Sequence, residues 1–264
     1  RALVHAGAAL VPFLRAALED TTLMRDTLVR RGVTVATMTP SCLRLFEQAE
    51  LPGLRILMTV GEPPDPADVE HYAARLRYVN GYGPTENSAA SSMGVVPAQA
   101  ARITSGRPLP NTSIRILDSR QLPVPPGAAG EIWLGGIGLS LGYLNRPDLT
   151  AQSFIETPAG RLYRSGDLGR WTPDGELQIL GRLDSQVKLR GQRVELAEIE
   201  HRLSAHSRVR QAAAAVETLP GGTQTLWAFV VLQPGNSAPL QPEWHAFLSQ
   251  TLPRAAWMSI WRIW

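Results

Sequence analysis

The chain has 264 residues, of which 44% are hydrophobic and 19% are charged, a composition typical of a folded globular protein of one large or two smaller domains. Its net charge is only +3, and its Lys and Arg residues are scattered without a basic run, so no nucleic-acid partner is expected. No stretch approaches the roughly 18 to 20 apolar residues that span a membrane, and the first residues show no cleavable signal pattern, so no membrane partner is expected either.

The single cysteine, Cys42, excludes an internal disulfide and fits a reducing compartment, so we expect a cytoplasmic protein. Cys42 lies among apolar residues in PSCLRLF, where core packing is a better interpretation than a nucleophile. The five histidines show neither an HExxH motif nor paired metal-ligand spacing, which argues against a histidine metal centre.

Helix and strand signals alternate through the first 80 residues. TTLMRDTLVRRG predicts a helix that ends at Gly32, TPSCLRLFEQAE a second with Thr39 as its cap, and PDPADVEHYAARL a third with Asp65 before Pro66. Between them, VTVATM, LRILMTVGE and RYVN predict short buried strands. The alternation indicates a parallel sheet, whose ligands gather beyond the carboxyl ends of the strands, where residues 80–86 fall.

The pattern changes from about residue 103. SIRILD, GEIWLGG and ELQILGR predict short strands between Gly, Pro and Asp turns, as in a small antiparallel barrel or sandwich. From about residue 184, QVKLRGQRVEL predicts a hairpin that turns at residues 190–192. An amphipathic helix with Leu196, Ile199 and Leu203 on one face follows. VRQAAAAVE and LWAFVVL then predict strands and PEWHAFLSQTL a helix, which completes a small α+β unit.

Four blocks, in this order, resemble the adenylate-forming superfamily and specifically the amino-acid adenylation domains of nonribosomal peptide synthetases. They are NGYGPTE (80–86), GEIWLGGIGLSLGYL (130–144), YRSGDL (163–168) and GRLDSQVKLRGQRVELAEIE (181–200). The resemblance implies an α/β fold. Residues 1–183 would form the C-terminal part of the large AMP-binding domain, with a parallel sheet layer and a small β-barrel-like subdomain. Residues 184–264 would form a small α+β domain, truncated before its catalytic Lys.

The family reaction joins an amino acid to ATP, with Mg²⁺, to give aminoacyl-AMP and pyrophosphate. The acyl group then passes to a phosphopantetheine thiol on a peptidyl carrier protein. The resemblance therefore implies ATP, Mg²⁺ and phosphopantetheine as cofactors, and the amino acid, a carrier protein and a condensation domain of the same synthetase as partners. Catalysis of the first step is mostly positioning and neutralisation of phosphate charge.

The first block of the resemblance implies that Tyr82 would stack against adenine and that Asn80 would form a hydrogen bond with the adenine edge. Thr85 would donate its hydroxyl to the α-phosphate and Glu86 would help to hold Mg²⁺. An aromatic face suits any nucleobase, and Mg²⁺ prefers carboxylate oxygen. The alternative is a plain turn with a capping Thr and a solvated Glu.

The later blocks imply further roles. Asp167 would accept hydrogen bonds from both ribose hydroxyls, and Arg182 would lie near ribose and phosphate. Asp184 matches the hinge on which the small domain rotates, and Lys188, on the hairpin that contains Gly191, would face the active site during thioester formation. The alternatives are an Asp in a Gly-flanked turn and a solvated strand lysine.

By alignment with the family, six residues would line the side-chain pocket: Thr37, Met58, Val60, Gly81, Ala89 and Ala90. The lining is apolar with a small floor and carries no charge, which favours a sizeable hydrophobic or aromatic amino acid. For Met58 and Val60, ordinary core packing is nearly as good an interpretation.

Three parts that the resemblance implies are absent. The Gly-rich phosphate loop and the Asp for the substrate's α-amino group would precede residue 1, and the essential Lys would follow residue 264. The final LPRAAWMSIWRIW lacks the family's Tyr and closing Pro and holds three of the seven Trp in its last eight residues. We hypothesise a frameshift or premature end there, which the neighbouring nucleotide sequence would test.

Losing one positioned charge donor typically costs about 10²–10³ in rate. With a phosphate loop and a Lys both missing, we expect the chain by itself to show no detectable amino-acid-dependent pyrophosphate exchange. Robust exchange would contradict this expectation. Two other interpretations stay open: a fragment of an acyl-CoA or aryl-acid adenylate-forming ligase, and a non-catalytic remnant. The upstream Asp would separate the first of these, and titration with a non-hydrolysable aminoacyl-AMP analogue the second.

Overall fold

A computed structural model describes residues 7–12, 20–158, 160–183, 186–189, 192–218, 224–237, 239 and 241–250. Contacts divide the chain into two compact units, Arg1–Ser165 with Gly169–Leu180 and Gly166–Leu168 with Gly181–Trp264. The division falls near the domain boundary predicted at residue 183, which itself stays a prediction. Within the described residues, no helix has the length and apolar character that crossing a membrane requires.

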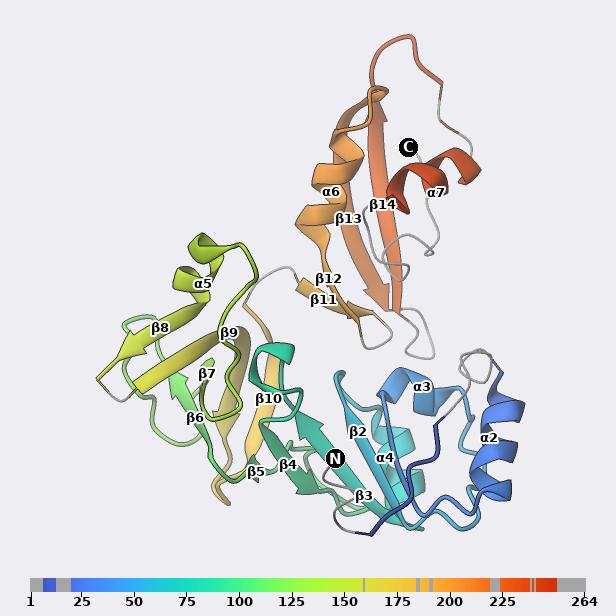
Figure 1. Cartoon of the computed structure of the whole chain (residues 1–264), viewed down its shortest axis with the longest axis vertical. Coiled ribbons are helices and arrows are strands. Elements are labelled where there is room, and N and C mark those ends of the chain that lie inside the picture. The colour runs from blue at the N-terminus through green and yellow to red at the C-terminus, as the bar shows by residue number, and fades with distance from the viewer. Residues whose placement is uncertain are drawn as a thin grey trace. The chain divides into compact units, whose positions relative to one another are not determined.

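The first unit begins with a five-stranded sheet of mixed direction (Figure 1). In chain order its elements are α2 (Thr21–Arg30), β1 (Val35–Met38), α3 (Pro40–Arg44), β2 (Ile56–Val60), α4 (Pro66–Ala73), β3 (Arg77–Tyr82), the 3-10 turn η2 (Thr85–Asn87), β4 (Ser92–Val95) and β5 (Arg107–Pro108). Strands β1, β2 and β3 are parallel, as the alternating pattern predicts. Strands β4 and β5 extend the sheet antiparallel, and the sequence pattern did not predict them.

Side-chain caps set where α2, α3 and α4 begin. Asp20 Oδ1 accepts from Leu23 N–H at 3.0 Å, Thr39 Oγ1 from Cys42 N–H at 3.2 Å and Asp65 Oδ1 from Ala67 N–H at 2.8 Å. The predicted caps Thr39 and Asp65 are thus found in place. Helix α3 is shorter than predicted. Glu47 and Gln48 have φ of 49° and 60°, and a right-handed helix cannot continue through residues with positive φ.

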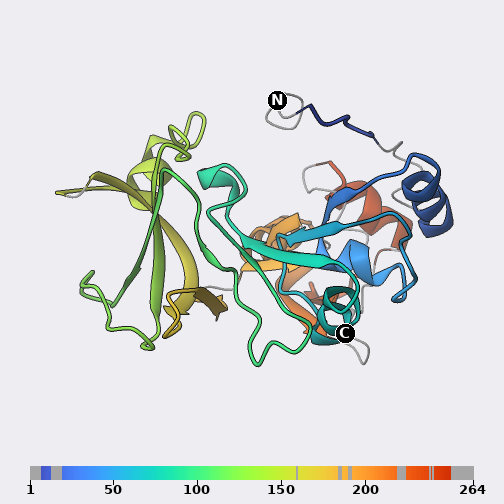
Figure 2. The ribbon, with the colours of Figure 1, turned by 90° about the horizontal axis from the view of Figure 1, so that it is seen from below.

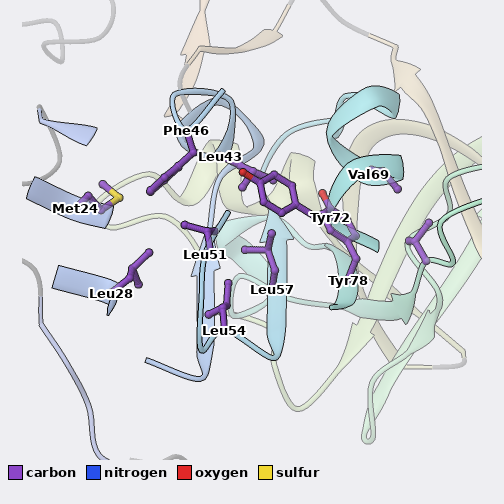
Figure 3. Packing of buried hydrophobic residues seen from close by; sticks show 11 residues of the cluster. Met24, Leu28, Leu43, Phe46, Leu51, Leu54, Leu57, Val69, Tyr72 and Tyr78 are labelled. Carbon is purple, nitrogen blue, oxygen red and sulfur yellow. The ribbon is translucent and has the colours of Figure 1, made fainter. Parts of the chain in front are cut away.

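Helices α2, α3 and α4 cover one face of this sheet (Figure 3). Leu57 of β2 and Tyr78 of β3, both 0% exposed, point into a cluster with side chains of all three helices, including Met24, Leu43 and Tyr72. Successive side chains of a strand point to opposite faces, so the neighbours of Leu57 and Tyr78 lie on the other face. The strand residues predicted to line the pocket therefore lie on the face that these helices do not cover.

A second sheet belongs to the first unit except for its residues 166–168 and 181–182, and Figures 1 and 2 show it beside the first sheet. Its elements are β6 (Thr112–Leu117), β7 (Gly130–Gly136), α5 (Pro147–Ser153), β8 (Phe154–Thr157), β9 (Gly160–Trp171) and β10 (Leu177–Arg182). The strand order is β10-β9-β7-β6, with β8 also paired to β9. Among the described strands this is an open path rather than a closed barrel. The sequence predicted β6, β7 and β10 but did not predict α5, β8 or β9.

Close backbone contacts tie the two sheets together. Ser105 N–H donates to Leu177 O, and Leu177 N–H donates to Gly106 O, each at 2.7 Å. At Gly106, whose φ is +64°, a Cβ atom would lie 2.1 Å from Met93 O and 2.3 Å from Gly94 Cα. The approach therefore requires glycine.

The second unit is a small α+β assembly, as predicted. It contains β11 (Gln186–Leu189), β12 (Gln192–Glu195), α6 (Leu196–Ser204), β13 (Val209–Thr218), β14 (Gln224–Leu232) and α7 (Gln241–Leu248). Strands β11 and β12 form the predicted antiparallel hairpin, and β13 pairs antiparallel with β14. Ile199 and Leu203 of α6 are 0% and 1% exposed and pack with Trp244 and Leu248 of α7 in one core.

Candidate functional site

A tight loop follows β3 at the carboxyl end of the parallel strands. Its neck is closed by Ser91 N–H, which donates to Tyr82 O at 2.7 Å. A Cβ atom on Gly83 would lie 2.6 Å from Ala90 Cα, so only glycine fits there. Ser88 and Ala89 have φ of 57° and 68°, the left-handed region that non-glycine residues rarely adopt. The loop is thus a fixed and locally strained structure, the kind of backbone that concentrates at functional sites.

Thr85 and Glu86, at the tip of this loop, have opposite environments. Thr85 is exposed, whereas Glu86 is 8% exposed. Glu86 Oε1 accepts a hydrogen bond from the Tyr143 hydroxyl at 2.6 Å, and Glu86 O accepts from Ser140 N–H at 2.8 Å. An oriented carboxylate beside an exposed hydroxyl provides a ligand for a hard cation and a donor for an anion.

Tyr143 is a site residue that the sequence reasoning missed. It is the next-to-last residue of the block GEIWLGGIGLSLGYL, to which the sequence analysis gave no tyrosine role. Burial and then the hydrogen bond to Glu86 raise the pKa of the Tyr143 hydroxyl above its usual value. The hydroxyl therefore stays protonated, and remains the donor to Glu86, at neutral pH. Its ring meets that of Phe154 edge-on, with centroids 5.8 Å apart.

Asn80 and Tyr82 lie deeper in the unit than an adenine contact would suggest. Asn80 is 4% exposed, and its Nδ2 donates to Thr104 O at 2.9 Å. Tyr82 is 5% exposed and packs in a cluster with residues of the second sheet such as Ile116 and Leu134. These contacts anchor β3 to its surroundings, and the predicted adenine roles of both residues stay predictions.

Four of the six predicted pocket residues share one face of the first sheet. Thr37 pairs in register with Met58, and Val60 pairs with Gly81. Thr37 is exposed and Met58 and Val60 are half-buried, on the face that the helices leave open. Ala89 and Ala90 lie in the strained loop instead. The sheet therefore brings the first four together, while the pocket role of all six stays a prediction.

Asp167 and Arg182, both in the second unit, form a buried ion pair. Arg182 Nη1 lies 2.6 Å from Asp167 Oδ1, and the two side chains are 15% and 6% exposed. Asp167 lies within β9, so the alternative of a Gly-flanked turn is wrong. Lys188 lies in β11 opposite Arg193, and the structure does not describe its side chain. Asp184 and Gly191 lie outside the described residues.

The donors available to a metal suit Mg²⁺ better than a transition metal. Among the described residues, no group of three or more His, Cys, Asp or Glu side chains is arranged so that it could hold a metal ion. Protein-bound Mg²⁺ commonly takes only one or two carboxylates, with substrate phosphates and water completing its shell. Glu86 fits that pattern.

Cys42 packs against a neighbouring side chain, with its Sγ 4.0 Å from Met24 Sδ, and burial raises the pKa of its thiol.

Comparison with known proteins assigns the chain to a family. The model of a family described as AMP-binding enzyme matches residues 2–144. The chain belongs to the AMP-binding enzyme family. One component protein of the linear gramicidin synthase of Brevibacillus parabrevis is 42% identical to this chain over 252 residues. That match covers 94% of the chain and 3% of the synthase protein.

Solved structures agree with this assignment. The crystal structure of IdnL1 has a TM-score of 0.83 and 32% identity over 98% of this chain and 56% of its own. NpsA-ThdA, an artificially fused adenylation–PCP di-domain of a peptide synthetase from Klebsiella oxytoca, has a TM-score of 0.79 and 28% identity over 97% of this chain and 48% of its own. The chain thus spans about half the length of these structures and a small part of the gramicidin synthase protein. The predicted resemblance to adenylation domains of peptide synthetases is confirmed.

Proposed function

We propose that the chain is part of an amino-acid-activating adenylation domain of a nonribosomal peptide synthetase, working in the cytoplasm. The observation that carries this proposal is Glu86, a nearly buried carboxylate held by Tyr143 beside the exposed Thr85, at the carboxyl end of β3. The similarity to a gramicidin synthase protein and to an adenylation–PCP di-domain supports it.

In the first half-reaction, an oxygen of the amino-acid carboxylate attacks the α-phosphorus of ATP. The bond from that phosphorus to pyrophosphate breaks, and aminoacyl-AMP forms. Thr85 donates to the α-phosphate, and Glu86 holds Mg²⁺, which neutralises phosphate charge when bound. Asp167 accepts from the ribose hydroxyls, and Arg182 orients that carboxylate through its 2.6 Å contact.

Asn80 and Tyr82 are proposed to bound the adenine site. In the second half-reaction the acyl group passes from AMP to the phosphopantetheine thiol of a peptidyl carrier protein, with a condensation domain as a further neighbour in the synthetase. Lys188, on the β11–β12 hairpin, serves this half-reaction, and Asp184 serves as the hinge between the two.

The proposed substrate is a sizeable apolar or aromatic amino acid. Thr37, Met58 and Val60 offer its side chain uncharged surface on the open face of the sheet, and Gly81 adds no side chain to fill the space. Ala89 and Ala90 add only methyl groups at the loop. A charged substrate side chain would meet no counter-charge among these six residues and would lose its hydration.

The test is calorimetric titration of the 264-residue chain with non-hydrolysable adenylates that carry a phenylalanyl, aspartyl or lysyl group. We expect saturable binding, tightest for phenylalanyl. Asp167→Asn should weaken it about 10-fold or more, because hydrogen bonds to a charged acceptor typically contribute about 1.5–3 kcal/mol.

A ligand control separates the ribose contact from misfolding. Removing the 2′-hydroxyl from the phenylalanyl adenylate should weaken its binding to the unsubstituted chain. The same removal should weaken binding to Asp167→Asn by little, because the substitution has already removed the hydrogen bond between the 2′-hydroxyl and the Asp167 carboxylate. If the two losses add in full, Asp167 does not bind the ribose. If none of the three adenylates binds, the proposed function is wrong.

A further inference from the structure

One segment, residues 136–144, contacts Glu86 at both its backbone and its side chain. Ser140 N–H donates to Glu86 O at 2.8 Å, and the Tyr143 hydroxyl donates to Glu86 Oε1 at 2.6 Å. A third contact joins the same segment to the loop, because Ser88 Oγ donates to Gly138 O at 2.8 Å. The direction of the Glu86 carboxylate therefore depends on where this segment lies.

Hydrophobic burial fixes only part of the segment, because Leu139 and Tyr143 alone among its apolar side chains pack, partly buried, against a hydrophobic core. Three of its aliphatic side chains, those of Ile137, Leu141 and Leu144, are 84%, 95% and 89% exposed. Gly136 and Gly142 have φ of +110° and +143°, which gives the backbone turns that other residues would resist. Polar contacts must consequently supply much of what holds it.

Arg161 of β9 supplies two of those contacts. Its Nη1 donates to Ser140 O at 2.9 Å and its Nη2 donates to Leu141 O at 2.8 Å. The guanidinium also lies 4.5 Å from the ring centroid of Phe154, the ring that Tyr143 meets edge-on. A planar fork that bonds two successive carbonyls while it rests on an aromatic ring fixes both the position and the orientation of the segment.

We propose that Arg161 and Tyr143 are positioning residues for the metal-binding carboxylate. Arg161 holds the segment 136–144 through the carbonyls of Ser140 and Leu141, and the segment holds Glu86 through Ser140 N–H and the Tyr143 hydroxyl. Neither residue touches nucleotide or metal in this arrangement. The inference rests on the proposed function only in giving Glu86 to Mg²⁺.

The primary test measures the affinity of the 264-residue chain for ATP with MgCl₂ and with EDTA instead. Tyr143→Phe removes only the donor hydroxyl, and Arg161→Lys keeps the charge but not the fork. Each should reduce the Mg²⁺-dependent gain in ATP affinity by about 10- to 100-fold, the usual cost of losing a group that orients a metal ligand. Glu86→Gln should abolish that gain, and Glu86→Gln with Tyr143→Phe should be no worse than Glu86→Gln alone.

Two matched controls should leave the Mg²⁺-dependent gain unchanged. Tyr72→Phe makes the same chemical change beneath the first sheet, where the hydroxyl bonds Ala49 O at 3.3 Å. Glu156→Gln removes the exposed carboxylate 3.6 Å from Arg161 Nε without touching the fork. A loss in either control equal to that in the Tyr143 and Arg161 variants would overturn the proposal.

Hydrogen exchange gives a readout that does not depend on nucleotide. The Ser140 amide should exchange about 10-fold faster or more in Arg161→Lys and at the unsubstituted rate in Glu156→Gln. An unchanged Ser140 rate in Arg161→Lys overturns the inference. A second result would also overturn the inference but leave the proposed function intact: the Mg²⁺-dependent gain in ATP affinity is lost in Glu86→Gln but unchanged in Tyr143→Phe and Arg161→Lys. A gain that survives Glu86→Gln, or is absent from the unsubstituted chain, overturns both.

Discussion

Gly106 contacts both sheets of the first unit. Its carbonyl oxygen accepts a hydrogen bond from Leu177 N–H of the second sheet. Its backbone passes so close to β4 that a Cβ atom would lie 2.1 Å from Met93 O, and its φ is +64°. Gly106→Ala should therefore reduce the free energy of unfolding by about 2–5 kcal/mol, the sum of typical overpacking and left-handed backbone costs. Urea denaturation followed by circular dichroism measures the loss.

Gly175→Ala is the matched control, because Gly175 has φ of +75° and nothing within 4 Å of the position of a Cβ atom. It should cost only the backbone part, about 1–2 kcal/mol. Equal losses in the two variants would mean that the contact with β4 contributes nothing.

At this same scale, sequence reasoning found residues whose role is local. Thr39 and Asp65 could be assigned as caps because each bonds an amide within three positions along the chain. Glu86 was found through its motif. Tyr143 was missed because its bond to Glu86 spans 57 positions, and no local pattern reports such a contact.

Among the elements, α4 and β3 bury two tyrosines whose ionisation opposes folding. Burial raises the pKa of Tyr72 and of Tyr78 to about 12. The hydroxyls stay protonated in the folded protein while the unfolded chain releases its protons near pH 10. This contribution to stability is complete below pH 10 and is lost as the pH rises to 12.

We therefore expect the free energy of unfolding to fall between pH 9 and pH 11 by about 1 kcal/mol for each tyrosine. Urea denaturation at the two pH values measures the fall. Tyr72→Phe should remove about half of the part due to this pair, and a variant with both tyrosines changed to Phe should remove all of it. An unchanged fall in the doubly substituted protein would assign the alkaline loss to other groups.

The predictability of the elements follows from the strength of their local signals. Strands β1 and β2 were predicted because each is a short, mostly apolar run between capped helices, and β3 because it follows capped α4 and runs into the loop NGYGPTE. Strands β4 and β5 read SMGV and RP, too short and mixed for any periodicity; β4 pairs with the edge of β3, and β5 pairs in turn with β4. Strand β9 runs through the single glycine of YRSGDL, which locally indicates a turn, and its neighbours in the sheet override that tendency.

On the scale of the whole molecule, the two units have separate hydrophobic cores and should unfold as separate cooperative transitions. Leu57 and Leu203 are matched probes, 0% and 1% exposed in the first and second unit. Leu203→Ala should weaken only the second unit and Leu57→Ala only the first, each by about 2–5 kcal/mol through the cavity left behind.

Differential scanning calorimetry distinguishes this outcome from a single shared transition. If both substitutions lower every transition together, the units are one cooperative body. From the sequence, the change of pattern near residue 184 indicated a second unit. The grouping of Gly166–Leu168 with that unit could not be predicted, because it depends on contacts far apart in the chain.

Ser88 and Ala89 put stability and ligand binding in opposition. Two successive left-handed residues cost about 1–2 kcal/mol each relative to glycine, and they lie beside the carboxylate that the proposed reaction needs. Selection for heat resistance alone would favour glycine at position 89, and at position 88 only where relief of the backbone strain exceeds the loss of the hydrogen bond from Ser88 Oγ to Gly138 O. Selection for catalysis would resist that exchange, because a glycine pair lets the loop explore more backbone conformations. In an evolving population, these two positions are where the two selective pressures would conflict.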